Sequence, residues 1–521
     1  MPGPPIQQGP FRVPSFYPIV PRRLQPWIYL VFAFCFLLSG GIYGGAMSQV
    51  MGEYSLMRED VLMIVMCNVV GVNMPFPFLF RLKFAFTNRR LLLNAALMVA
   101  LCNFLIMFTD SVPLMCLLGY IAGFFKLCGC FECMSTIQLW MTPKRDFRVF
   151  FPLLYCMVLG NMYLSPWLTE HLIYIFQDWR IVNWGMTGIM LTIAFLIRLL
   201  THDFRFMKPL PFISIDYLGC ALWSLLMIEV IFFFNYGEHY NWLAAEVMRM
   251  DLLFMMITAY LCIQRMRHIR HAYIVIGAWK YKRLVPLLIL FAFTELMGST
   301  PKVLQTAFTT NILHWGSVTT NVFNLIEWGG SIIGCLFCLV WMKGLKLKYT
   351  NLLTLGALAM AAYPVMMYFL IDPQLNIEKM YAPILIRSFG NAIFFCTLTI
   401  YLEELMPFQH FFMGLTMAGL IRNGPISTMC SGIYSFGLRH QIADNLSRGL
   451  PYDMSNILMI SIRQLYGITC WIGLAVLGIF LLWNLQPVRS TMKKMPYWNV
   501  VGKYAKKYWK QRRRRNVATA Q

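Results

Sequence analysis

Residues 165–184 read SPWLTEHLIYIFQDWRIVNW. An apolar run ends in this stretch, a short polar turn follows at Asp178-Trp179-Arg180, and a second apolar run begins. Each run is long enough for an α-helix of about 20 residues, the length that crosses a hydrocarbon core of about 30 Å. The stretch therefore predicts a tight connection between two membrane-spanning helices.

The composition places the whole chain in the same class. Of its 521 residues, 59% are apolar and 13% are charged, whereas soluble domains have about 45–50% and about 25%. A chain this long and apolar cannot cover its apolar surface in water, so we expect a polytopic membrane protein. The 15 cysteines lie mostly inside apolar runs, where free cysteine behaves as a small apolar residue. We therefore predict neither a disulfide framework nor a metal site.

Apolar runs of about 20 residues recur along the chain and predict fourteen spans. Helices are expected, because the runs exceed the roughly 10 residues of a barrel strand. The predicted fold class is all-α, a polytopic integral membrane protein. The predicted spans are 27–50, 60–80, 91–108, 112–140, 150–168, 181–200, 217–234, 245–263, 284–307, 318–341, 352–370, 381–401, 411–436 and 465–485.

The net charge of +22 comes mainly from Lys and Arg in alternate loops. Such loops are typical of the cytoplasmic side of a membrane protein, which excludes nucleic acid as the expected partner. The pattern predicts that both termini are cytoplasmic and that the number of spans is even. Only the loop after residues 381–401 departs from it, with Glu403, Glu404 and His410.

Four residues of the opening stretch, namely Pro166, Trp179, Arg180 and Asn183, carry a family resemblance. They resemble the span 5–span 6 junction of the 14-span drug:proton antiporters of the major facilitator superfamily. That junction reads Gly-Pro-x-x-Gly-Gly, followed later by Trp-Arg-x-x-Phe-x-x-Asn. The resemblance implies a secondary transporter.

Two further motifs resemble the same family. Arg422-Asn423-Gly424 is similar to its Arg-Asn-x-Gly in span 13, and Arg89-Arg90 ends its span 2–span 3 loop motif. The resemblance implies two six-helix bundles with two inserted helices. The implied parts are a cytoplasmic segment 1–26, a first bundle 27–202, a linker with two inserted helices 203–283, a second bundle 284–487 and a basic cytoplasmic tail 488–521.

In this superfamily the first and fourth helices of each bundle line the transport cavity, and three of those four predicted spans hold charge. Glu132 and Glu295 are candidates for proton coupling, because that chemistry needs a carboxylate shielded by burial and balanced by a movable cation. Glu327 is the third candidate and ends a polar stripe with Asn321 and Asn324.

The cations of these spans are candidate counter-charges or substrate ligands. They are Lys126, Lys302 and Arg387, and Asn391 lies one turn after Arg387. Lys302 shares a helical face with Glu295 unless Pro301 bends the helix. Static ion pairs that lock helices together are the other interpretation. Gating or packing candidates are Arg89, Arg90, Pro166, Arg180 and Arg422.

The function expected from this resemblance is export of drugs or other small amphipathic compounds across a bacterial inner membrane, driven by proton entry. No GxxxxGK[ST] loop occurs, so the energy would come from an ion gradient. The resemblance implies protons, a small-molecule substrate and the lipid bilayer as partners, together with a periplasmic adaptor and an outer-membrane channel. No cofactor and no enzymatic activity are expected.

Two alternatives stay open. One is an uptake carrier or exchanger for a specific solute, anionic if Lys126, Lys302 and Arg387 form its site. The other is a non-transporting scaffold or sensor. Its basis is that Ser39 and Gly119 stand near the places of two charged residues of the family.

Overall fold

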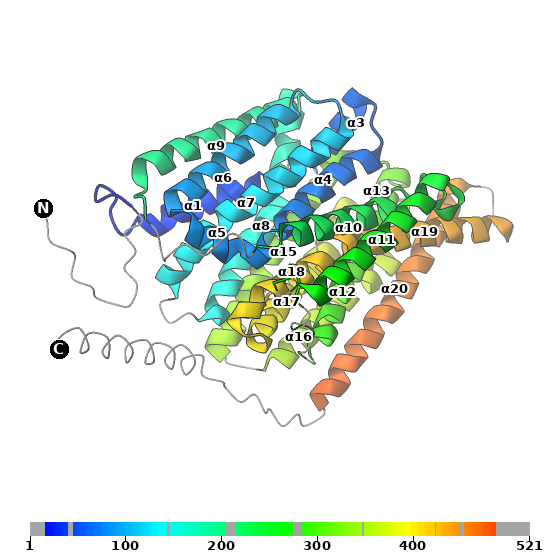
Figure 1. Cartoon of the computed structure of the whole chain (residues 1–521). Coiled ribbons are helices and arrows are strands. Elements are labelled where there is room, and N and C mark those ends of the chain that lie inside the picture. The colour runs from blue at the N-terminus through cyan, green and yellow to red at the C-terminus, as the bar shows by residue number, and fades with distance from the viewer. Residues whose placement is uncertain are drawn as a thin grey trace, which may run out of the picture. The chain divides into compact units, whose positions relative to one another are not determined.

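The computed structural model describes residues 16–39, 45–142, 146–204, 215–269, 271–275, 277, 279, 281, 283–345, 348–422, 424–448 and 453–485. Within these ranges the chain is helical (Figure 1), and the only extended pairing is one isolated antiparallel bridge between Phe16 and Thr201. This confirms the all-α prediction. Most of the predicted segment 1–26, part of the linker and the tail 488–521 lie outside the described residues.

The helices before residue 216 come in the order α1 (Gln25–Leu38), α3 (Met47–Tyr54), α4 (Arg58–Asn73), α5 (Leu79–Ala85), α6 (Asn88–Ile106), α7 (Val112–Met141), α8 (Phe147–Phe176) and α9 (Arg180–Leu200). Two helices follow, α10 (Tyr217–Tyr236) and α11 (Glu246–His268). The remaining helices are α12 (Leu284–Thr300), α13 (Thr306–Asn311), α14 (Ser317–Thr320), α15 (Val322–Leu339), α16 (Tyr349–Leu370), α17 (Tyr381–Leu405), α18 (Phe408–Arg422), α19 (Pro425–Ser447) and α20 (Met454–Leu485).

Eleven helical segments of the described chain are long and apolar enough to cross a membrane. Of the fourteen predicted spans, those at 27–50, 245–263 and 411–436 are not among the eleven. In the first of them α1 has only 14 residues, and in the last the helix is interrupted between α18 and α19. The multi-pass prediction is therefore confirmed, and the number fourteen stays a prediction.

The connection predicted at Asp178-Trp179-Arg180 is present. Helix α8 ends at Phe176, Gln177 adopts a left-handed conformation with φ of 57°, and α9 begins at Arg180. The loop predicted over 81–90 is shorter than expected. Residues 79–85 form α5, so Lys83 lies on a helix that continues the predicted second span. The apolar residues of α5 bury one face of the helix. The positive residues among them had instead indicated a loop.

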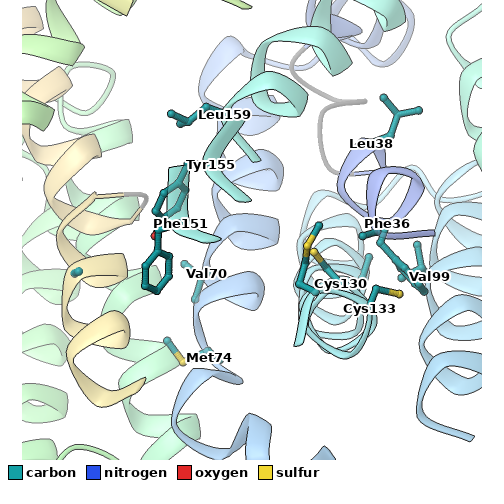
Figure 2. Packing of buried hydrophobic residues seen from close by; sticks show 14 of the residues in the cluster. Phe36, Leu38, Val70, Met74, Val99, Cys130, Cys133, Phe151, Tyr155 and Leu159 are labelled. Atoms are coloured by element: carbon teal, nitrogen blue, oxygen red, sulfur yellow. The ribbon is translucent and has the colours of Figure 1, made fainter. Parts of the chain in front are cut away.

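Among the helices before α10, α7 packs against α1, α4 and α6, and α6 also packs against α9. Glycine permits the close crossing of α4 and α7, because a Cβ on Gly123 would lie 2.1 Å from the Asn68 carbonyl oxygen. Figure 2 shows part of the buried apolar cluster, with Phe36 of α1 beside Cys130 and Cys133 of α7.

Among the helices after α11, α17 packs against α12, α15 and α16, and α12 packs against α18 and α19. Helix α8 joins the two groups through its contacts with α15 and α17, and α18 contacts α4. Helix α10 packs against α11, α4 and α19. The division of the chain into two bundles with an insert stays a prediction. Residues up to Phe480 form one compact unit, and Leu481–Gln521 form a second.

Candidate functional site

Five charged residues of the later helices lie close together. We name them the central charged cluster: Glu295, Lys302, Glu327, Arg387 and Arg422. They come from α12, the π-helical turn Pro301–Gln305, α15, α17 and α18. Four of them are more than four-fifths buried as side chains, whereas Lys302 is exposed. Lys302 lies on the π-helical turn that begins at Pro301.

One ion pair of the cluster joins α15 to α17. An Nη of Arg387 donates a short hydrogen bond to Oε1 of Glu327, and the guanidinium carbon lies 5.3 Å from the ring centre of Tyr363. The Ser388 hydroxyl donates to the backbone carbonyl of Glu327 at 2.6 Å. The side chains of Arg387 and Glu327 are 6% and 13% exposed. This pair therefore fits the alternative interpretation from the sequence, a static ion pair that locks two helices together. Protonation of Glu327 would neutralise its carboxylate and break the pair.

The second ion pair is looser. Nε of Arg422 lies 3.8 Å from Oε1 of Glu295, and the Arg422 guanidinium stacks on the Phe395 ring. Lys302 Nζ donates to the Ser427 hydroxyl at 2.9 Å, and both residues lie near Glu295. Lys302 and Glu295 thus face a common space, as their spacing predicts, with Arg422 as a cation that the sequence analysis had assigned to gating or packing.

Helix α8 brings two tyrosines to the cluster. The Tyr155 hydroxyl donates to Thr399 Oγ1 of α17 at 3.1 Å. The Tyr163 side chain is buried on the same helix, α8, and lies near Asn391, Glu327 and Arg387. The cluster therefore lies where an earlier helix meets the later ones. Motion of α8 relative to α17 would change these contacts.

The charges predicted on α7 are arranged differently. Glu132 forms a fully buried ion pair with Lys83 of α5, with Nζ 3.3 Å from Oε2, and Lys83 also donates to the Ser135 hydroxyl. Lys126 is half-buried, and within the described chain no carboxylate lies within 4 Å of its ammonium. The cation beside Glu132 is thus Lys83 and not Lys126.

The gating and packing candidates near the ends of the earlier helices all have partners. Arg180 contacts Glu53 at 2.6 Å, and Arg89 donates to the Arg198 carbonyl at 2.7 Å. The backbone N–H of Arg90 bonds to the Thr87 hydroxyl at the start of α6. The carbonyl oxygen of Pro166 would lie 2.6 Å from a Cβ on residue 45, which is glycine. These contacts fit packing, and a gating role stays a prediction.

One cavity of about 250 Å³ lies between α1, α8 and α9. Its walls are apolar apart from Ser165 and Thr169, and it includes no residue of the central charged cluster. This cavity therefore provides open volume without a charged lining residue, whereas the central charged cluster provides charged side chains.

Sequence reasoning missed several residues of this region: Lys83, Tyr155, Tyr163, Phe395 and Ser427. The interruption of the predicted thirteenth span had a readable signal, because Gly424-Pro425 follows Arg422 and this dipeptide disrupts a helix. The tyrosines gave no such signal, since aromatic residues are common throughout the apolar runs. Asn423 lies outside the described residues.

Comparisons with known proteins identify the fold. A scan against models of protein families and a search of curated proteins found no match. A solved structure of an auto-inhibited POT family peptide transporter matches with a TM-score of 0.53 and 13% identity, over 88% of this chain and 97% of that one.

A second solved structure is the major facilitator superfamily proton:xylose symporter XylE bound to 6-bromo-6-deoxy-D-glucose. It matches with a TM-score of 0.50 and 12% identity, over 86% of this chain and 95% of that one. The chain therefore has the fold of major facilitator superfamily transporters.

Proposed function

We propose, from the fold that this chain shares with major facilitator superfamily transporters, that it is a proton-coupled secondary active transporter working by alternating access. The observation that carries the proposal is the pair of enclosed carboxylates in the central charged cluster. Glu295 faces Arg422 and Glu327 faces Arg387, each across a helix–helix contact. Charge inside a membrane is costly and is generally retained for a function.

The chemistry of coupling follows from these contacts. Protonation of Glu295 would remove its attraction to Arg422 and Lys302, and these cations would then be free to take other partners. Because Arg422 also adjoins Tyr155 and Tyr163 of α8, a change at Glu295 can alter the contact between the two groups of helices. Such a link between a proton site and a moving interface is what alternating access requires.

The resemblance of Pro166, Trp179 and Arg180 to drug:proton antiporters supports export of drugs or other small amphipathic compounds. On that basis we place the protein in a bacterial inner membrane with both termini cytoplasmic. A periplasmic adaptor and an outer-membrane channel would be partners, and the protein would catalyse no reaction. These assignments rest on the resemblance alone.

A second candidate is uptake or exchange of a solute with bound protons. The observation that favours it is an excess of positive charge. Arg387, Arg422 and Lys302 of the cluster face only Glu295 and Glu327. Protonation of either carboxylate would increase that excess, so a proton and an anion would bind together. The matched symporter of known structure is itself coupled to protons.

The test measures transport of a fluorescent amphipathic dye in inverted vesicles, and proton flux in proteoliposomes, each under an imposed pH gradient. The variants are Glu295→Gln and Glu327→Gln. Glu132→Gln is the matched control, because its ion pair lies outside the cluster. We expect gradient-driven transport in the wild type and in the control, and its loss in at least one cluster variant. Gradient-driven transport that persists in both cluster variants would contradict the proposal.

A further inference from the structure

We propose that the start of α19, together with Arg422 at the end of α18, is a binding site for the carboxylate group of a small organic anion, with Arg422 as its main donor. The proposal rests on the proposed function, because the anion would be the transported substrate. It names a substrate class that neither the fold nor the sequence resemblance specifies. Three features of this region support it: an unsatisfied guanidinium, a helix start, and an uneven balance of charge.

Arg422 is enclosed but poorly bonded. The residue is 7% exposed, and its Nη1 atom is buried without a hydrogen-bond partner among the described residues. Its Nε lies 3.8 Å from the Glu295 carboxylate, which is longer than a hydrogen bond. A guanidinium has five N–H donors, and leaving a buried one unpaired is costly. An incoming planar carboxylate matches the geometry of these donors.

The start of α19 adds positive potential at the same place. Helix α18 ends at Arg422, and α19 begins at Pro425 and runs for 23 residues. The Thr428 N–H donates to the Gly424 carbonyl at 3.3 Å, which is the first hydrogen bond of α19. The N–H groups of Ile426 and Ser427 come before it in the chain, so the helix offers them no carbonyl partner. Such groups and the helix dipole attract anions. A helix that starts at membrane depth is a common way for secondary transporters to bind a substrate carboxylate.

The balance of charge leaves room for an added anion. At the interruption, Arg422 and Lys302 face the single carboxylate of Glu295, because Glu327 is bonded to Arg387. Lys302 is exposed while its Nζ bonds to Ser427, so one cation of the site lies at its edge. The site already accommodates one carboxylate, which is why we favour that group for the ligand.

The surroundings of Arg422 suggest the rest of the ligand. Phe395 lies against its guanidinium, and Tyr155 and Tyr163 are its neighbours on α8. These rings offer apolar faces with hydroxyl groups at their ends. The site thus fits a small carboxylate with an aromatic or apolar body.

The test uses the full chain in lipid nanodiscs and three small-molecule probes that have nearly the same size and shape but different charge. Benzoate is the anion, benzamide the neutral analogue and benzamidine the cation. Binding is measured by calorimetry at neutral pH. We expect benzoate to bind at least about tenfold more tightly than benzamide or benzamidine, since charge-assisted bidentate bonds exceed neutral ones. Equal binding of benzoate and benzamide, or no binding of benzoate, overturns the site.

Variants locate the binding. Arg422→Gln should weaken benzoate at least about tenfold, and Arg422→Lys should weaken it less, because the charge stays and the planar fork is lost. The matched control is Arg439→Gln on the next helix, α19, because Arg439 is an exposed arginine that also pairs with a carboxylate, that of the half-buried Glu238. Should Arg422→Gln fail to fold, Arg422→Lys supplies the measurement. Wild-type affinity in a folded Arg422 variant overturns the proposal.

A third variant, Glu295→Ala, removes the internal carboxylate and should tighten benzoate binding. Weaker binding in this variant would contradict the role given to the excess charge. The outcomes for function and site are separable. Gradient-driven dye transport without benzoate binding would keep the proposed function and remove the anion site, and benzoate binding without any proton-driven flux would do the opposite.

Discussion

Buried charged residues are arranged differently in the helices before α10 and in those after α11. In the earlier group, the described buried ion pair joins Lys83 to Glu132, and Lys83 lies two residues before the end of α5 at Ala85. In the later group, Glu327 and Arg387 lie within their helices, and Arg422 lies at an interruption between two helices.

The two groups also differ in how many buried charges they gather. In the earlier pair Lys83 also donates to Ser135, whereas both carboxylate oxygens of Glu132 are buried without a hydrogen-bond partner among the described residues. Charges farther along a span cost more, and they are found where a protein uses them. The earlier group has one described buried ion pair, whereas the later group gathers the five residues of the central charged cluster, and on this basis we propose that the later group responds to a proton or a ligand.

Among the variants that test this contrast, Arg387→Met is expected to have the largest effect on the free energy of unfolding. Removing this cation leaves Glu327 enclosed without its partner, which costs about 3–5 kcal/mol of folding free energy. The measurement is thermal unfolding in detergent. The double variant Arg387→Met with Glu327→Gln should recover much of the loss, because no lone charge remains. A single variant as stable as the wild type would show that Glu327 is not held as an anion.

A smaller loss is expected from Glu132→Gln in the earlier group. Lys83 keeps its hydrogen bond to Ser135, so we expect a loss of about 2–3 kcal/mol, in the range of one charge-assisted bond. Proton-driven transport should persist in the folded protein. If this variant folds normally but loses proton coupling, the contrast between the two groups fails, because the earlier group would then carry the chemistry.

The third prediction concerns Asp216, which lies outside the spans at the start of α10. Burial raises the pKa of its carboxyl, but hydrogen bonds from Arg265 and from the N–H groups of Gly219 and Tyr273 outweigh it and hold the pKa below its usual range. A lowered pKa contributes stability above the unfolded value of about 3.9, and this stability is lost as the pH falls through the folded value.

We therefore expect stability to decline on acidification below about pH 4 in the wild type, and Asp216→Asn to reduce that decline. The variant should also lose about 1–2 kcal/mol at neutral pH, because hydrogen bonds to a charged group are replaced by neutral ones. Unfolding midpoints between pH 3 and pH 7 provide the measurement. An unchanged acid limb in the variant would assign the pH dependence to other carboxyls.

The smallest effect is expected at the connection between α8 and α9. Arg180 and Glu53 form an ion pair at 2.6 Å with side chains 41% and 37% exposed, and such pairs contribute about 0–1 kcal/mol. Arg180→Gln should leave the unfolding midpoint nearly unchanged. Transport rates then decide between packing and gating, because a slower rate at unchanged stability would assign Arg180 to gating.

The amount that could be predicted from the sequence differs between backbone and site. The apolar runs predicted the helices and the turn at residues 177–179, because helix length and apolar content are local properties. Local reasoning was less successful at 27–50 and 411–436, where the runs are divided into separate helices. Gly424-Pro425 is the dipeptide that permits the division of the second run.

The sequence by itself determined that the chain is an all-helical membrane protein with enclosed carboxylates on particular helices. A bilayer requires long apolar helices, so a charged residue within an apolar run stands out in the sequence. Only the tertiary structure decided the partners: Lys83 for Glu132, Arg422 for Glu295, and the tyrosines of α8 near Arg422. Pairing depends on which helix faces meet, and side chains on different helices, far apart in the sequence, carry no local signal of their contact.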